Sequence, residues 1–349
     1  MLPPEIQPSV LLIALAAVGY LLILAWTEDM EAAKAPMVYS DSPVLSQQPL
    51  AAQSDRPVVD EFAPIDSDIA PVPQAPVTQP AVGKGRLVKV ETPVLEVWID
   101  LLGGDIARVQ LPTYPISLEQ PDTPFLLMDR SASRTYIAQS ALIGSDGIDK
   151  TGARPLYEAA SDSLTLTEGG ELVLTTTLDD ARVSKIFAFE PDSHLINIRY
   201  EVVNLATRSK TMRLLTQIKR DRLPPPTDET VPLAPSPYLG GALTTPDNNY
   251  KKVDFDDLDE GNFQASAIGG WMAFLQHYFL TAWVAPSDQA TNYLARKTSD
   301  GFYLFGFTGQ NQSIQPGATG IWRADFYAGP KDQVVLETIA PYLNLTVDY

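Results

Sequence analysis

Apolar and polar residues alternate with a period of two through most of the chain after Gly83. Between residues 95 and 101 the odd positions are aliphatic, and two of the three even positions between them are acidic. Between residues 196 and 202 the even positions are apolar and the odd ones are polar or charged. The alternation recurs at 212–219 and 322–327. A strand with one buried and one solvated face produces this pattern, so these segments predict β-strands.

The predicted strands follow one another without intervening helical periods. This order favours a large antiparallel β-sandwich over a parallel α/β sheet. Residues 83–349 show no obvious internal linker, so we expect one mainly β domain. Within it, segments 164–167 and 172–177 flank two glycines and predict a β-hairpin closed by a Gly-Gly turn. Prolines clustered at 224–237 predict a surface loop.

A short amphipathic helix is predicted near the C-terminal end, over about residues 330–343. Pro330 follows a glycine and suits the first helical position. Pro341 should end or kink the helix at about residue 340. The apolar positions that recur at helical spacing are Val335, Ile339 and either Tyr342 or Leu343. Two interpretations stay open, a lid over an open end or edge of the sheet and a docking element at the membrane-proximal end of the domain.

The N-terminal end contains a run without charged residues from Ile6 to Thr27. About 20 apolar residues are enough for a helix to cross a hydrocarbon core, so we predict a transmembrane helix over residues 6–27. The predicted anchor residues of this helix are Val10, Leu15, Leu22 and Trp26, and Trp26 lies where an aromatic residue at the distal membrane interface is expected. A cleaved signal peptide is the alternative, but no basic residue precedes Lys34 and a proline follows the small-x-small site. The few flanking basic residues leave the orientation open.

Residues 28–82 predict a disordered linker between this helix and the β domain. The segment holds nine prolines and nine acidic residues but only two basic ones. Its apolar residues occur singly, without helical or strand periodicity. Such a segment cannot bury enough apolar surface to offset the entropy lost on ordering, so we interpret it as an extended spacer.

The overall composition excludes several classes of function. A net charge of -18 argues against nucleic-acid binding, which requires a basic surface. The absence of cysteine excludes disulfides, thiolate metal sites and cysteine nucleophiles. No motif for phosphate, dinucleotide or zinc chemistry occurs, so we expect no catalytic, cofactor or metal site. The acidic run at 254–260 fails the ligand spacing of a calcium loop and is interpreted as a solvated loop.

The two histidines are the remaining candidates for catalysis. A large antiparallel sandwich with an imidazole and a carboxylate could act as a sugar mutarotase, moving protons on a hemiacetal. His194 follows a turn-forming sequence, which favours a surface position, and His277 lies among aromatic residues of a core or rim. Nothing in the sequence brings the two together. Sugar binding or mutarotation is therefore kept as the alternative function.

Several short segments, in order along the chain, carry a resemblance to a known family. They are Leu102–Ile106, Leu111–Pro115, Gly152–Tyr157, Thr245–Asp247, Tyr250–Phe255, Gly269–Trp283 and Ala340–Tyr349. Together they resemble the periplasmic domain of the YidC family of bacterial membrane protein insertases. The resemblance extends in order through the whole predicted β domain.

The resemblance implies a location, a fold and a function. Members place the N-terminus in the cytoplasm and the large domain in the periplasm of Gram-negative bacteria, anchored in the inner membrane. The domain is implied to be a β-supersandwich similar to sugar mutarotases, with a C-terminal helix packed against it. The implied function is to insert and fold inner-membrane proteins, alone or beside the Sec translocon, without enzymatic activity.

In the family, the helices that form the insertion groove follow the equivalent of Tyr349. We therefore expect residues 1–349 to hold the anchor and a periplasmic interaction domain without that groove. The expected partners are the membrane, the Sec translocon with its accessory subunits, and nascent inner-membrane proteins. Candidate docking residues at the C-terminal helix are Lys331, Val335, Ile339 and Tyr342. Those in the region before it are Tyr238, Tyr250 and Phe255.

Overall fold

The computed structural model describes residues 86–117, 119–149, 153–225 and 238–347. The predicted transmembrane helix at 6–27, with Val10, Leu15, Leu22 and Trp26, lies outside these ranges, as does the predicted linker at 28–82. Among the described residues, no helix combines the length and the apolar character that crossing a membrane requires.

The first sheet contains eleven strands in the described part of the chain, and all its pairings are antiparallel except that of β1 with β7. In spatial order the strands are β14 (Phe263–Ile268), β17 (Ala290–Lys297), β18 (Tyr303–Thr308), β11 (Lys210–Arg220), β5 (Thr135–Ile143), β4 (Gln120–Arg130), β3 (Asp105–Ser117), β2 (Glu96–Asp100), β1 (Leu87–Glu91) and β7 (Ser163–Thr165). The short strand β19 (Gln312–Ile314) pairs with β11.

The second sheet contains nine described strands, all antiparallel. In spatial order they are β13 (Asn248–Val253), β12 (Gly240–Thr245), β15 (Trp271–Leu275), β16 (Phe279–Val284), β20 (Thr319–Pro330), β10 (Leu195–Asn204), β9 (Ala181–Phe189), β8 (Gly170–Leu178) and β6 (Glu158–Ala159). The described helices are short, namely α2 (Phe255–Glu260), α3 (Gln333–Ile339) and the 3-10 helix η1 (Leu343–Thr346).

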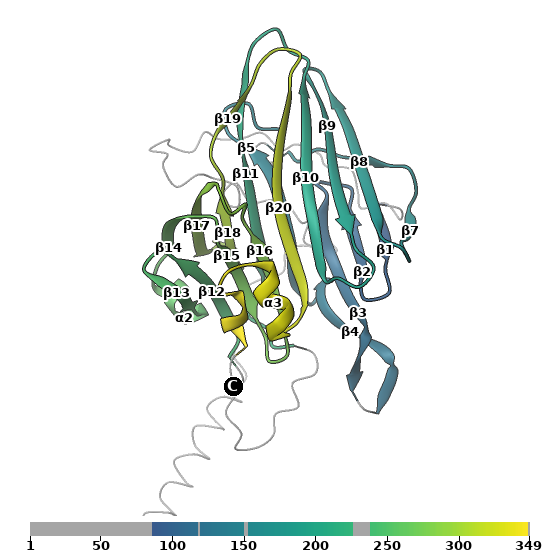
Figure 1. The fold of residues 1–349 in the computed structure, drawn as a ribbon, viewed down its shortest axis with the longest axis vertical. Coiled ribbons are helices and arrows are strands. Elements are labelled where there is room, and N and C mark those ends of the chain that lie inside the picture. The colour runs from purple at the N-terminus through teal and green to yellow at the C-terminus, as the bar shows by residue number, and fades with distance from the viewer. Residues whose placement is uncertain (1–85, 118, 150–152, 226–237, 348–349) are drawn as a thin grey trace, which may run out of the picture. The chain divides into compact units, whose positions relative to one another are not determined.

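The two sheets lie one over the other, with β8, β9, β10 and β20 in front in Figure 1. The main hydrophobic core lies between them and draws side chains from both sheets, such as Ile106 and Leu142 from the first and Phe187 and Ile198 from the second. This arrangement confirms the prediction of a mainly β, antiparallel sandwich, because each sheet buries one apolar face against the other.

The period-two pattern predicts strand β10 correctly. Its even positions from Ile196 to Val202 are at most 3% exposed, whereas its odd positions are exposed or half-buried. The strand pairs along its length with β9 on one side and β20 on the other. A central strand of a sheet with one solvated face has this distribution of side chains.

Strand β11 differs from the prediction because both of its faces are buried. The expected polar face contains Gln217 and Lys219, which are 3% and 7% exposed. Gln217 donates a hydrogen bond to Gln139 on the neighbouring strand β5 at 3.1 Å. The ammonium group of Lys219 lies 4.7 Å from the ring centroid of Phe302. Gln217 and Lys219 therefore have partners inside the protein, and their polarity does not indicate exposure.

The predicted hairpin around the two glycines is wrong. The segment before the turn forms β7, which pairs parallel with β1 in the first sheet. The segment after the turn forms β8, which pairs with β9 and β6 in the second sheet. Gly169 and Gly170 have positive φ angles of 81° and 150° and carry the chain between the sheets. The turn at the two glycines was predicted correctly, but the strands before and after it pair with other strands and not with each other.

Candidate functional site

The C-terminal helix α3 begins later than the sequence predicts. Pro330 is the last residue of β20, where it pairs with Phe279 on β16. Asp332 is the N-cap, because its carboxylate accepts hydrogen bonds from the backbone N–H groups of Val334 and Val335 at 2.9 and 3.2 Å. The helix ends at Ile339, before Pro341, as predicted.

Beneath α3 lies a second hydrophobic cluster, on the face of the second sheet that points away from the main core. The helical segment contributes Leu336, Ala340 and Leu343, which are at most 4% exposed. The sheet contributes Ala242, Trp271, Ala273, Leu275, Leu280, Ala282, Val284 and Tyr327. The indole N–H of Trp271 donates to the carbonyl oxygen of Pro341 at 2.9 Å, which fixes the turn between α3 and η1. We call residues 331–347 the cap, which covers a face of the sheet rather than its edge (Figure 1).

The apolar face of the C-terminal segment agrees with the prediction at Ile339 and at Leu343, the alternative to Tyr342, but contains Leu336 in place of Val335. Val335 and Tyr342 are 41% and 46% exposed, whereas Leu336 is fully buried. Ile339 is half-buried and packs against the margin of the second cluster. The helix therefore packs Leu336, and not Val335, against the sheet.

Four large apolar side chains of the cap are exposed on its outer side. We call them the cap surface, which consists of Val334, Val335, Tyr342 and Leu345 with exposed fractions of 74%, 41%, 46% and 42%. Tyr342 has a left-handed backbone conformation with φ of 66°, which is costly for a residue other than glycine. These four exposed apolar groups within residues 334–345 make the cap surface the candidate interaction site.

Lys331 joins the start of the cap to the turn between β15 and β16. Its backbone N–H donates to the carbonyl oxygen of Tyr278 at 2.9 Å. Tyr278 is 68% exposed, and its ring stacks on that of His277 with the centroids 3.9 Å apart. The predicted docking residue Lys331 therefore lies beside a second exposed aromatic group.

The candidate docking residues before the cap divide into two groups. Tyr238 and Tyr250 are half-buried at the margin of the second cluster, with the ammonium of Lys252 4.5 and 5.7 Å from their ring centroids. Phe255 is only 4% exposed and packs in the main core, 4.4 Å between ring centroids from Tyr303. The side chain of Phe255 is therefore not available to a partner.

The acidic run beside Phe255 is a helix and not the predicted loop. Asp254 caps α2, and a reciprocal pair of hydrogen bonds joins it to Asp257. Arg222 pairs with Asp256 at 2.5 Å, and Lys297 pairs with Asp259 at 2.8 Å. These contacts offset much of the repulsion among the carboxylates and allow the run to fold.

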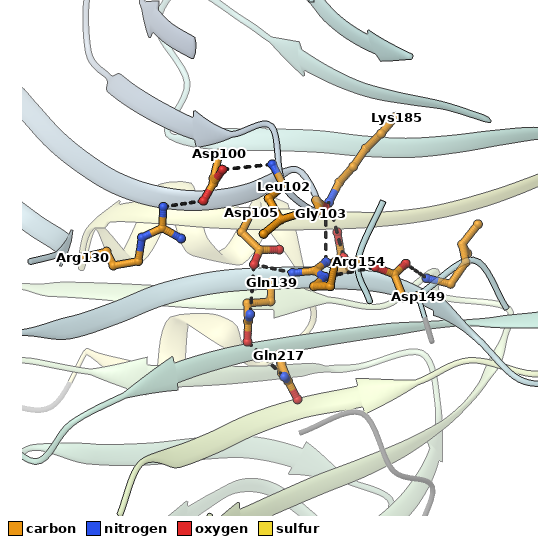
Figure 2. A network of polar contacts seen from close by, with 12 residues as sticks. Asp100, Leu102, Gly103, Asp105, Arg130, Gln139, Asp149, Arg154, Lys185 and Gln217 are labelled. Carbon is orange, nitrogen blue, oxygen red and sulfur yellow. Dashed lines mark hydrogen bonds and ion pairs between the residues drawn. The ribbon is translucent and has the colours of Figure 1, made fainter. Parts of the chain in front are cut away.

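Two segments that carry the family resemblance meet in a buried ionic network between the sheets (Figure 2). Arg154 forms an ion pair with Asp105 at the start of β3 and a second one with Asp149 at 3.0 Å. It also donates to the carbonyl oxygen of Ser140 on β5 at 2.8 Å. Gln139 donates to Asp105 at 2.9 Å. Arg154 therefore ties strands β3 and β5 to the connection that contains Asp149.

Lys185 reaches this network from strand β9 of the second sheet. Its ammonium donates to the carbonyl oxygen of Gly103 at 3.0 Å, and its side chain is 0% exposed. Burial lowers the pKa of Lys185 to about 7, because the charged form loses its hydration inside the protein. Burial also raises the pKa of Asp149, although the neighbouring Arg154 opposes that change.

Two glycines make room for these charged side chains. Gly103 and Gly104 have positive φ angles of 79° and 66°. A Cβ atom at Gly103 would lie 2.2 Å from the guanidinium carbon of Arg154, and one at Gly104 would lie 2.7 Å from the Cδ atom of Lys185. The Gly-Gly-Asp run of the resemblance therefore has a physical cause, since larger residues would push both cations out of place.

The network joins the two sheets of the domain through internal bonds. Its cations are bonded to internal carboxylates and carbonyl groups. Sequence reasoning did not single out Asp105, Asp149, Arg154 or Lys185 as site residues. The resemblance included Asp105 and Arg154 within its segments, but no local pattern connects them with Lys185.

The histidines do not line the described cavity that would hold a small ligand. This cavity has a volume of about 440 Å³ and lies where the β16–β17 and β18–β19 connections approach β20. Its lining includes Gln289, Gln310, Asn311 and Trp322 but no carboxylate or imidazole group. The ring of His194 instead packs near Tyr114 and Tyr327, and burial lowers its pKa to about 4. Mutarotation stays a prediction without support from this lining.

The described residues thus form a mainly β domain of two large antiparallel sheets, with a cap that exposes apolar groups. A profile of the YidC periplasmic domain family matches residues 87–349. The chain belongs to the YidC family.

Curated relatives match over nearly the whole chain. The membrane protein insertase YidC of Azotobacter vinelandii is 39% identical over 99% of this chain and 62% of its own length. That of Cellvibrio japonicus is 40% identical over 98% of this chain and 61% of its own length. The chain therefore spans about three fifths of the length of these relatives.

Solved structures give a more distant likeness. A galactose mutarotase-like protein from Lactobacillus casei is 10% identical with a TM-score of 0.48, covering 70% of this chain and 99% of that protein. A galactose mutarotase related enzyme from Lactobacillus acidophilus is also 10% identical, with a TM-score of 0.45, covering 69% of this chain and 97% of that one. Likeness at this level carries no conclusion about activity.

The lowered pKa of Lys185 predicts a specific pH dependence of stability. Between about pH 7 and pH 10 the unfolded chain holds a proton on this lysine that the folded chain has lost, so the free energy of unfolding rises with pH. We expect Lys185→Met to remove this contribution, a change on the order of 1 kcal/mol per pH unit. Urea unfolding of both proteins across this range measures it. The exposed control Lys251→Met should parallel the wild type, and a parallel profile for Lys185→Met would contradict the assignment.

Leu336 should hold the cap on the sheet. Leu336→Ala removes a fully buried side chain and is expected to destabilise the cap by about 2–5 kcal/mol. Hydrogen exchange should then quicken in residues 333–346 while β10 and β20 keep their protection. Val335→Ala, at a position 41% exposed, is the control and should change exchange little. Equal exchange in the two variants would show that Leu336 does not anchor the cap.

Proposed function

We propose that this chain is the membrane-anchored, periplasmic part of a YidC-type insertase and chaperone. In this function it aids the insertion, folding and assembly of inner-membrane proteins, alone or with the Sec translocon. The domain acts by contact and not by catalysis. The observation that carries the proposal is the cap surface, where Val334, Val335, Tyr342 and Leu345 are exposed in a member of this family.

The physical argument concerns the cost of exposing these groups. A large apolar side chain left fully in water forgoes stabilisation of about 1.5–3 kcal/mol that burial would provide, and the partly exposed Val335, Tyr342 and Leu345 forgo a fraction of that. The cap surface places four of them within residues 334–345, although the chain as a whole carries a net charge of -18. A partner with an apolar surface, such as a translocon subunit or an emerging transmembrane segment, would cover them. The exposed Tyr278 beside Lys331 would extend the same contact.

The proposal includes a topology. One transmembrane helix over residues 6–27 anchors the chain in the inner membrane of a Gram-negative bacterium, with its N-terminus in the cytoplasm. Residues 28–82 form a flexible spacer, and residues 83–349 form the periplasmic domain, a β-supersandwich similar to sugar mutarotases. Support comes from the length of the apolar run, the composition of the spacer and the membership of the family.

Site-specific photo-crosslinking in cells tests this function. A photoreactive residue at Val334 or Tyr342 is expected to crosslink to a translocon subunit or to a nascent inner-membrane protein. The matched control is Val173 on β8, which is 42% exposed and lies outside the cap. It should give little of either product. Crosslinks to neither class of partner from the cap, or equal yields from Val173, would count against the proposed function.

A further inference from the structure

The two sheets end in four edge strands among the described residues, and three of these are poorly suited to pair with another chain. Strands β7 and β6 contain three and two residues. Strand β13 carries exposed lysines at 251 and 252. Short edges and edge lysines are the usual features that prevent a sheet from adding a further strand.

Strand β14 lacks these protective features. Its sequence, Phe-Gln-Ala-Ser-Ala-Ile, contains no charge and no proline. All six residues pair with β17 on one side, and no described strand pairs with the other side. Alternate residues of an antiparallel strand present both backbone groups to the same neighbour, so about three residues offer an N–H and a C=O group to an added strand.

The side chains hold β14 in place without covering it. Phe263, Ala265 and Ala267 are half-buried and pack against the main core. Ile268, on the opposite face, is 74% exposed. The strand is therefore fixed by its inner face and by β17, and no strand in the described part of the chain pairs with its other edge.

The surroundings of β14 define the chemistry of the segment that would fit. The start of the strand follows α2, whose last residue, Glu260, is exposed. Asp256 and Asp259 of this helix are paired with Arg222 and Lys297, and the ammonium of Lys251 lies 4.7 Å from the ring centroid of Phe263. The end of the strand has the apolar side chain of Ile268. A segment added in antiparallel orientation would place its first residues beside Ile268 and its last residues beside Glu260. An apolar side chain followed by a basic one would complement this edge.

A second copy of the chain is a poor occupant. Each copy carries a net charge of -18, and pairing two β14 edges would bring two acidic α2 helices toward one another. Like charges at that distance oppose association, and an oppositely charged partner is favoured.

We propose that β14 binds an extended segment of a partner polypeptide by strand addition, and that this segment carries an apolar residue near Ile268 and a basic residue near Glu260. This inference rests on the proposed function as an interaction module and names one surface and the partner chemistry for it. Backbone hydrogen bonds supply the affinity, and the two end contacts set direction and selectivity.

A fluorescent short peptide of alternating valine and threonine, ending in two arginines, serves as the probe with the full chain in detergent. We expect saturable binding that falls at least tenfold when alternate peptide nitrogens on one edge are methylated. Methylation removes the N–H donors but keeps the side chains, so it tests strand addition without altering the protein. Two methylated peptides are compared, each carrying the methyl groups on one of its two edges. Undiminished binding of both, or no binding of the unmethylated peptide, would overturn the proposal.

Two variants of the protein itself test the β14 edge. Ile268→Lys places a charge at the end of the strand and should weaken binding several-fold. Glu260→Lys should weaken the arginine peptide but strengthen a matched peptide that ends in two glutamates. The control Leu205→Lys, at a position 47% exposed in the connection between β10 and β11, should bind as the wild type does. Loss of affinity only in the control, or no exchange of preference in Glu260→Lys, would contradict the assignment.

Sedimentation of the chain tests whether a second copy of the chain, and not a partner segment, occupies the β14 edge. A monomer that binds the peptide agrees with the proposal, whereas a dimer that Ile268→Lys dissociates would assign the edge to self-association and overturn it. This result is independent of the cap. Crosslinks from Val334 without peptide binding at β14 would reject the strand-addition inference and leave the proposed function standing. Peptide binding at β14 without crosslinks from the cap would reject the proposed function and leave strand addition standing.

Discussion

The buried guanidinium of Arg154 is the constraint on which the geometry of the domain depends. A charge without solvent must be paired, so Asp105, Asp149 and the carbonyl group of Ser140 have to meet around it. Lys185 brings the second sheet to the same place through Gly103. Removing one partner from such a group costs about 3–5 kcal/mol, because it leaves a buried charge uncompensated. The network therefore specifies how the two sheets meet.

The strands themselves could be predicted from the sequence, but their partners could not. Alternation identifies β10 because its pattern reports burial directly. It fails for β11, since the polar groups of Gln217 and Lys219 are buried with partners that lie far away in the sequence. The turn at Gly169 and Gly170 was recognisable from its residues, whereas the choice of β1 and β9 as neighbours depends on the whole fold.

The candidate site, too, could be predicted only in part from the sequence. Helical spacing located the C-terminal helix, but the helix starts only after the N-cap at Asp332 and packs Leu336 rather than Val335 against the sheet. The ionic network was out of reach, because its members lie near residues 104, 140, 152 and 185 and no period joins them. Resemblance to a family indicated membership without indicating why the shared residues matter. The structure supplies the reason for Gly103 and Gly104.

The domain therefore holds one network of paired charges between its sheets and exposes apolar side chains at the cap and an uncharged strand at β14. A double-mutant cycle between Asp105 and Arg154 tests most directly whether the network holds that frame. Unfolding free energies of Asp105→Asn, Arg154→Met and the double variant give the coupling between the two side chains. The account predicts a coupling of more than about 1 kcal/mol, as expected for contacting residues in one network. Effects that add to within about 0.5 kcal/mol would contradict it, since independent sites behave in that way.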